Sequence, residues 1–136
     1  MFQLHPRLEA DTVHVMDLPL SRVLLLKDAR YPWVVLVPQR PNLKEIHQLN
    51  DEDGIQLWRE MRVLSEFMEK NFDCQKVNVA ALGNMVPQLH VHIIAREEED
   101  FAWPKPVWAI GDAEEYDDQS LRYRIELLKQ GLGNAF

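Results

Sequence analysis

Two histidines stand one residue apart in an otherwise apolar stretch, PQLHVHIIAR, which covers residues 87–96. Side chains alternate between the two faces of a β-strand. A strand in this stretch therefore places Gln88, His90 and His92 on one face and the aliphatic residues between them on the other. Because the aliphatic face is expected to pack against a helix, the two imidazoles and the amide are left together on a polar surface or cleft.

The histidine pair has several chemical interpretations. Each ring can simply be a partly buried strand residue that is hydrogen-bonded to a neighbour. A metal site can use two imidazoles at this spacing, with His47 or an acidic residue as a further ligand. The pair can also work as general acid and base, since the ordinary pKa of histidine is about 6.5. Finally, a neutral imidazole can attack phosphorus while neighbouring donors hold the phosphate oxygens. The spacing alone does not choose among these four.

Length and composition limit the classes of protein. The 136 residues suit one domain, expected over 1–136. A net charge of -7 with scattered Lys and Arg disfavours nucleic acid polymers as partners. No apolar stretch approaches the ~20 residues of a membrane-spanning helix, and the N-terminus does not resemble a secretion signal. Cys74 is the only cysteine, which excludes an internal disulfide and favours a cytoplasmic location.

The elements that must position the histidines follow from periodicity and turn residues. Short Val- and Leu-rich segments predict strands over residues 13–18, 22–27, 33–38, 76–82 and 89–95. A helix is expected after the N-cap Asn50, and a final helix from about Asp117 to Gln130. The fold class is therefore α+β: an antiparallel sheet of about five strands with a main helix packed on it and a C-terminal helix.

Two further features of this pattern are specific enough to test. The main helix is expected to bury one stripe of apolar side chains, namely Ile55, Trp58, Met61, Leu64, Met68 and Phe72. The segment 100–112 carries two tryptophans and two prolines and is expected to be extended and laid over the domain. Trp103 and Trp108 are therefore candidates for a lid over a site, or for a dimer contact.

The stretch NVAALGNMVPQLHVHIIAR resembles the signature of the histidine triad (HIT) hydrolases and transferases, in which a turn precedes His-x-His-x-His. LVPQRPNLKEIHQL is similar to the upstream segment of the dinucleoside polyphosphate hydrolase branch. Together, over about 13–96, they make the resemblance specific. It implies a HIT-like fold with an aromatic and helical tail over about 101–131, a nucleotide substrate, no metal or other cofactor, and a homodimer.

The resemblance also implies roles for individual residues. His90 falls on the nucleophile and His92 on the third histidine, whereas Gln88 stands at the place of the first. A glutamine amide can still donate a hydrogen bond, but it cannot carry a proton or a positive charge.

Four further positions match nucleotide- or phosphate-binding residues of the family: Asn78, Asn84, His47 and Lys27. Lys27, or the adjacent Asp28, falls where an asparagine near the ribose is usual. The implied activity is attack by His90 on the α-phosphate of a dinucleoside polyphosphate or phosphoramidate, through a nucleotidyl-histidine. The alternative is a nucleotide-binding or regulatory module with little turnover, because Gln88 replaces a histidine.

Overall fold

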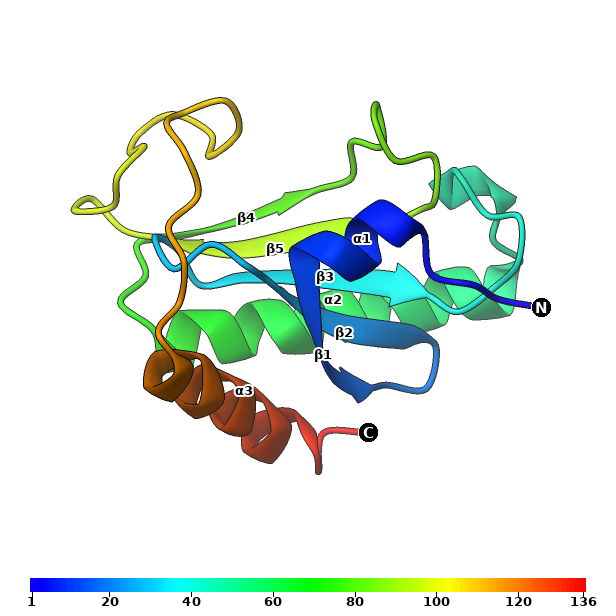
Figure 1. Cartoon of the computed structure of the whole chain (residues 1–136). Helices are drawn as coiled ribbons and strands as arrows, with labels where there is room; N and C mark the ends of the chain where they lie inside the picture. Colours follow the sequence, from blue (N-terminus) through cyan, green and yellow to red (C-terminus); the bar gives the residue numbers. More distant parts are fainter.

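A computed structural model describes the whole chain, residues 1–136, and its centre is a five-stranded antiparallel sheet of order β1-β2-β3-β5-β4 (Figure 1). The strands are β1 (Thr12–Asp17), β2 (Ser21–Leu26), β3 (Trp33–Pro38), β4 (Lys76–Ala80) and β5 (Val91–Arg96). All neighbouring pairs are antiparallel. The predicted α+β class is therefore confirmed, and each expected strand is present with its ends displaced by at most two residues.

The helices are α1 (Pro6–Asp11), a 3₁₀ turn η1 (Ile46–Gln48), α2 (Asp51–Asn71) and α3 (Asp118–Leu132). Helix α2 begins where it was predicted, because the Asn50 side chain accepts a hydrogen bond from the Asp53 N–H. Helix α1 and η1 were not predicted, since neither is long enough to show a helical repeat. None of the helices combines the length and apolar composition that crossing a membrane requires.

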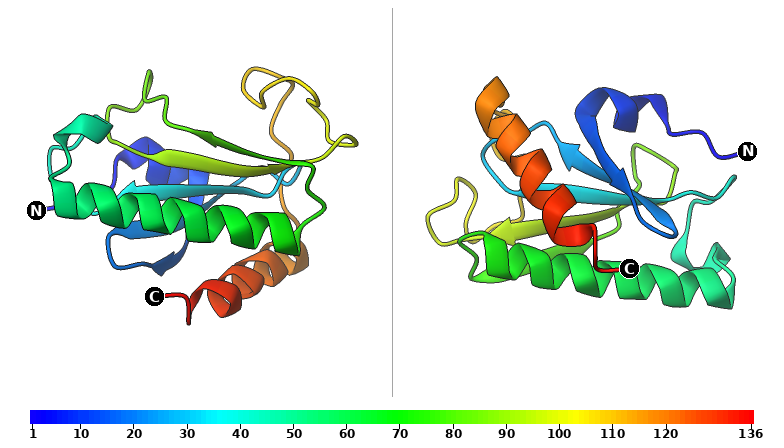
Figure 2. Two further views of the ribbon diagram at one scale, coloured as in Figure 1. Left: turned by 180° about the vertical axis from the view of Figure 1, so that it is seen from behind. Right: turned by 90° about the horizontal axis from the view of Figure 1, so that it is seen from below.

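The sheet is covered on both faces. Helices α2 and α3 lie on one face, and α1 lies on the other (Figures 1 and 2). Val91 and Ile93 of β5 belong to the core on the α2 side, together with Leu64. The opposite face has a second, smaller core that contains Trp33 and Ile94. His92 lies on this second face, as the strand alternation predicts.

The predicted buried stripe of α2 was partly wrong. Ile55 and Trp58 are 72% and 60% exposed, whereas Leu57 and Glu60 are buried at the sheet. The reason is Glu60, whose carboxylate accepts hydrogen bonds from the backbone N–H groups of Leu20 and Ser21 at 2.8 and 3.0 Å. These two bonds satisfy backbone donors where the β1–β2 connection enters β2. The helix therefore turns the acidic Glu60 toward the sheet, although a search for buried apolar residues would place Glu60 on the surface.

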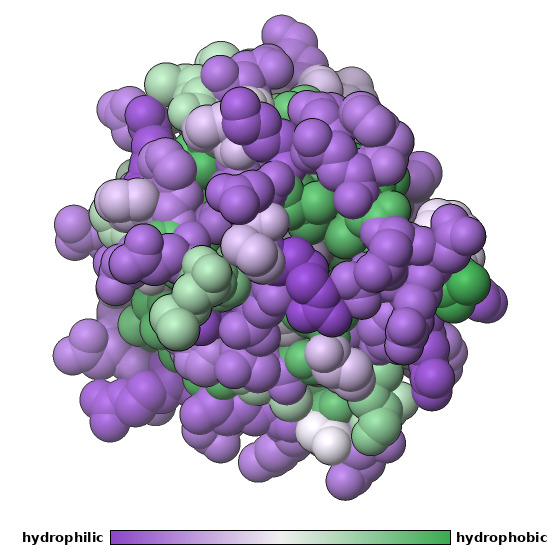
Figure 3. Space-filling view, turned by 90° about the vertical axis from the view of Figure 1, so that its right-hand side faces the viewer, coloured by the Kyte–Doolittle hydropathy of each residue, from purple (hydrophilic) through white to green (hydrophobic).

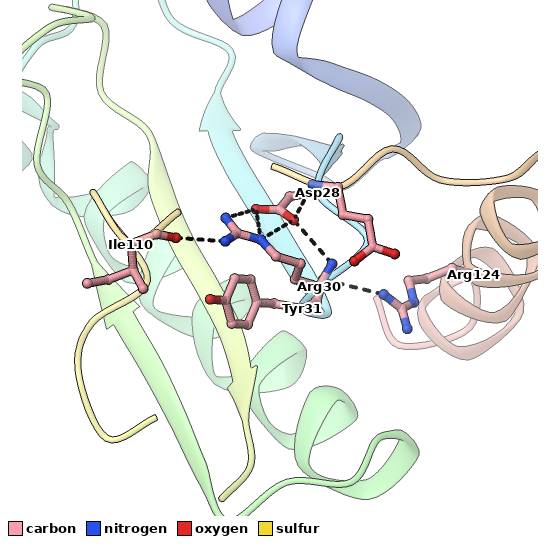
Figure 4. Close-up of polar contacts among 6 residues, drawn as sticks. Asp28, Arg30, Tyr31, Ile110 and Arg124 are labelled. Carbon is pink, nitrogen blue, oxygen red and sulfur yellow. Dashed lines mark hydrogen bonds and ion pairs between the residues drawn. The ribbon is translucent and has the colours of Figure 1, made fainter. Parts of the chain in front are cut away.

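The tail between β5 and α3 is not helical, as predicted, but the expected extended conformation was wrong: the segment is a series of turns and bends, with positive φ angles at Ala109 and Gly111. An ion pair ties this tail to the β2–β3 connection. The Arg30 guanidinium donates to the Asp28 carboxylate at 2.8 Å and to the Ile110 carbonyl oxygen at 2.7 Å (Figure 4). The Glu114 N–H also donates to Asp28. Burial alone would raise the pKa of Asp28, but the hydrogen bonds from Arg30 and Glu114 outweigh it and hold that pKa below its usual value. The tail is thereby held across the second face of the sheet.

Candidate active site

His90 lies immediately before β5 and is almost completely buried, with 6% of its surface exposed. Its Nδ1 is 2.7 Å from the carbonyl oxygen of Gln88. A carbonyl oxygen can only accept, so Nδ1 must carry a proton. The neutral ring then has an unprotonated Nε2, which is the form a nucleophilic imidazole requires. This carbonyl comes from two residues earlier in the same segment.

His92 lies on the same face as His90, and the two ring centroids are 4.9 Å apart. The Trp33 indole N–H donates to His92 Nδ1 at 2.9 Å. Burial lowers the pKa of His92 to about 4, and the nearby His90 shifts it in the same direction. His92 is therefore a neutral ring near pH 7.

His90 lines two cavities. One, of about 360 Å³, is bordered by Leu8, Trp33, Asn84, His92, Trp108 and other residues of α1 and the β4–β5 connection. The other, of about 260 Å³, is bordered by Lys44, His47, Gln88 and residues of the same connection. The larger cavity is mainly apolar and aromatic, and the smaller one carries more polar side chains. His90, the candidate nucleophile, thus borders both an apolar and a more polar cavity.

The outer surface at the end with the N-terminus and η1 is mainly hydrophilic, and apolar side chains show there only in smaller patches (Figure 3). Lys44 and His47, which border the smaller cavity, belong to this end of the chain's fold. A charged or polar ligand group would therefore approach the smaller cavity over a mainly hydrophilic surface.

Gln88 borders the smaller cavity, but its amide is also bound to the N-terminal segment. Its Nε2 donates to the Gln3 carbonyl oxygen at 2.8 Å, and its Oε1 accepts from the His5 N–H at 2.9 Å. A primary amide nitrogen carries two hydrogens, so one donor remains after the bond to Gln3. Gln88 therefore fastens the N-terminal segment beside the site and retains one N–H for a ligand.

The other four predicted binding residues divide into two groups. Asn84 and His47 each border a cavity that His90 also borders. Asn78 does not border either cavity; its Oδ1 accepts from Arg96 at 2.9 Å. Lys27 is exposed and its Nζ donates to the Ala10 carbonyl oxygen at 3.0 Å. The structure thus brings Asn84 and His47 to His90 and leaves Asn78 and Lys27 apart from it.

A three-ligand metal site is not assembled. Nowhere in the chain do three or more His, Cys, Asp or Glu side chains converge in a way that could hold a metal ion. His47 therefore does not complete a ligand set with His90 and His92. The third ligand that a metal site at the histidine pair would need is not in place.

Trp108 is the site residue whose position the sequence left open. Its ring packs edge-on against Trp33 at 5.7 Å and against His92 at 5.1 Å, and it borders the larger cavity. Trp103 lies elsewhere, beside the Arg96 guanidinium. The sequence predicts Trp33 only as part of a strand, and no local pattern shows that its N–H meets a histidine 59 positions later.

A five-stranded antiparallel sheet with two neighbouring histidines on one face defines a class of protein, and comparison with known proteins identifies that class. The family model for the HIT domain matches residues 7–99, so the chain belongs to the HIT family. Members of this family are generally nucleotide-binding proteins, hydrolases or transferases.

Solved structures agree with this assignment. A histidine triad protein from Bradyrhizobium japonicum is 46% identical, with 96% of this chain and 97% of that chain covered and a TM-score of 0.94. A histidine triad protein from Marinobacter aquaeolei VT8 is 44% identical, covering 98% and 97%, with a TM-score of 0.95. One from Sinorhizobium meliloti 1021 is 40% identical, covering 96% and 97%, with a TM-score of 0.93. The comparison with curated proteins found no match.

Proposed function

We propose that the protein hydrolyses nucleoside phosphate conjugates, either dinucleoside polyphosphates or phosphoramidates, through a nucleotidyl group carried on His90. The observation that carries this proposal is the bond from His90 Nδ1 to the Gln88 carbonyl oxygen, which makes Nε2 the unprotonated nitrogen of the neutral ring, in a residue that borders two cavities. The resemblance of the upstream segment, residues 36–49, to the dinucleoside polyphosphate hydrolase branch supports the first substrate class.

The reaction would proceed by two displacements at the same phosphorus atom. His90 Nε2 attacks the α-phosphorus, an N–P bond forms, and the bond to the leaving group breaks with its electron pair on the departing atom. Water then attacks the phosphorus, the N–P bond breaks, and the water proton is released as the nucleoside monophosphate forms. One difficult displacement is thereby divided into two easier ones. No step in this scheme uses a metal or another cofactor.

The two cavities suit the two halves of such a substrate. The larger one has the apolar and aromatic lining that a nucleoside base requires, including Leu8 and Trp108. The smaller one offers Lys44, His47 and the free N–H of Gln88 to the phosphates or the leaving group. Asn84 and the His92 ring complete the donors near the phosphoryl oxygens.

Gln88 also supports the second candidate function, a nucleotide-binding module with little turnover. In the resemblance this position belongs to the first triad histidine, and an amide cannot protonate a leaving group. Both polar atoms of the Gln88 side chain are bonded to the N-terminal backbone. A protein that needed only to hold a nucleotide would lose nothing by this arrangement.

Trapping the intermediate separates the two functions. The protein is mixed with a dinucleoside polyphosphate labelled at the α-phosphorus and denatured either in alkali or in acid. We expect label on the peptide that contains His90, stable in alkali and lost in acid, together with release of nucleoside monophosphate. Tight binding of the compound with neither label nor product would support the binding module and contradict hydrolysis.

We further infer that two copies of the chain pair, as the HIT resemblance implies, and that the single cysteine suits a cytoplasmic location. Strand β4 is one of the two outer strands of the sheet, and α2, which packs beside it, exposes Ile55 and Trp58. Large apolar side chains exposed together often mark an interface.

Replacing Trp58 with glutamate is therefore expected to shift the protein from dimer to monomer in sedimentation velocity. The substitution puts a charge where apolar surface would be buried. Tyr123 of α3 is 69% exposed, and Tyr123→Glu serves as the matched control with no expected change. A monomeric parent protein, or equal effects of the two substitutions, would contradict the proposed interface.

A further inference from the structure

The contact between Trp33 and His92 determines which nitrogen of His92 carries a proton. Both residues are buried, with 5% and 6% of their surfaces exposed, and the indole Nε1 lies 2.9 Å from His92 Nδ1. An indole N–H can only donate. His92 Nδ1 must therefore be the acceptor, and in the neutral ring the single proton resides on Nε2.

Protonation of both His92 nitrogens would break this contact. A proton on Nδ1 would face the indole N–H, and His92 forms no ion pair with a carboxylate that could compensate; its aromatic neighbours are Trp33, Trp108 and His90. The lowered pKa of His92, caused first by burial and then by His90, agrees with this reasoning. The ring is thus held neutral with an N–H at Nε2.

The two histidines consequently carry their protons on opposite nitrogens. His90 has its proton on Nδ1, because the Gln88 carbonyl oxygen accepts from it, while His92 has its proton on Nε2. The rings are neighbours, at 4.9 Å and an interplanar angle of 72°. Both rings border the larger cavity, and in their neutral forms Nε2 of His90 has a lone pair while Nε2 of His92 has an N–H.

We propose that Trp33 is a positioning residue that holds His92 as a neutral N–H donor for a phosphoryl oxygen, next to the unprotonated nitrogen of His90. The inference rests on the proposed function for its ligand, although the state of the ring does not. It predicts that the site binds phosphate through neutral donors at His92 rather than through an imidazolium. Trp108 packs edge-on against both Trp33 and His92, and Arg30 binds the Ile110 carbonyl oxygen two residues further along the tail.

The test is the substitution Trp33→Phe, which removes the N–H and keeps an aromatic ring. Nitrogen-15 NMR of the imidazole side chains reports which nitrogen is protonated. In the parent protein we expect His92 Nδ1 to be unprotonated at pH 7. In the variant we expect a mixture of the two neutral forms, because no donor then favours either nitrogen, and a higher pKa of His92. The turnover number is expected to fall about 10- to 100-fold, as when a partner that orients a functional histidine is lost.

Trp108→Phe is the matched control, since Trp108 also packs on His92 but donates no hydrogen bond to it. It should leave the His92 proton on Nε2 whatever it does to activity. If the two substitutions changed the His92 tautomer equally, Trp33 would act only by packing against the ring, and the proposal would be overturned.

The parent protein alone also provides a decisive measurement if Trp33→Phe does not fold. A proton on Nδ1 of His92 in the folded parent at pH 7 would overturn the proposal without any variant. Because this NMR measurement needs no substrate, its outcome is independent of the hydrolysis assay. A parent protein with the expected tautomer and no turnover would contradict the proposed function while leaving the role of Trp33 intact.

Discussion

Replacing His90 with asparagine is expected to lower the turnover number by about four to six powers of ten, as loss of a covalent nucleophile does in other enzymes. This corresponds to about 5–8 kcal/mol of transition-state stabilisation. An asparagine amide can occupy much of the same space, but it has no lone pair able to displace a leaving group from phosphorus. Steady-state hydrolysis of a dinucleoside polyphosphate measures the loss, and calorimetric titration with a nucleoside monophosphate measures binding.

The titration shows where the loss occurs. Binding within a few-fold of the parent protein, together with the loss of turnover, would place the effect on the chemical step. His14→Asn is the matched control, because the His14 side chain is 53% exposed and pairs with Asp17 outside the site. It should leave turnover unchanged. If His90→Asn kept a tenth or more of the parent rate, His90 would not be the nucleophile.

Replacing Arg96 with methionine is expected to reduce the free energy of unfolding by about 3–5 kcal/mol, the usual result of removing one partner from a buried ion pair. The Arg96 guanidinium donates to both carboxylate oxygens of Asp100 at 2.7 and 3.0 Å, and their side chains are only 2% and 4% exposed. Arg96 also donates to Asn78. Methionine leaves that carboxylate buried without its counter-charge.

The state of Asp100 supports this expectation. Burial alone would raise its pKa, but hydrogen bonds from Arg96 and from the Glu97 and Trp103 N–H groups outweigh burial and keep the pKa below its usual value. The carboxylate is therefore charged near pH 7, and its charge needs the guanidinium.

Urea denaturation measures the loss of stability, and Arg40→Met provides the comparison. The Arg40 guanidinium pairs with Asp53 at 2.7 Å in similar geometry, but its side chain is 45% exposed, so about 1 kcal/mol or less is expected. The double substitution Arg96→Met with Asp100→Asn should recover part of the loss, because the unpaired charge is removed. Equal losses for Arg96→Met and Arg40→Met would show that the burial of the Arg96 pair has no energetic consequence.

The elements of the fold were largely predictable because the rules that place them are local. The five strands and both long helices follow from alternation, helical repeat and caps within each segment. The stripe of α2 marks the limit of this approach. An apolar repeat predicted Ile55 and Trp58 inside, but the sheet presents two unpaired N–H groups there and Glu60 meets them.

The candidate site divides in the same way. Strand alternation placed His90 and His92 together, and the turn before them carried Asn84 into the same region. Asn78 also lies on that face of the sheet, but the partner that its amide meets is Arg96. The order of residues along a strand tells which face a side chain takes, and not which neighbour it contacts.

The sequence by itself was enough to predict that the two imidazoles share one face of a strand, because alternation along a strand depends only on backbone geometry over a few residues. The spacing of the motif was enough to indicate the family. Only the tertiary structure decided the chemistry of each ring. The Gln88 carbonyl and the Trp33 indole set the two protons on opposite nitrogens, and the Gln88 amide meets a backbone more than 80 positions away. Such contacts depend on how distant segments pack in three dimensions, which no local spacing encodes.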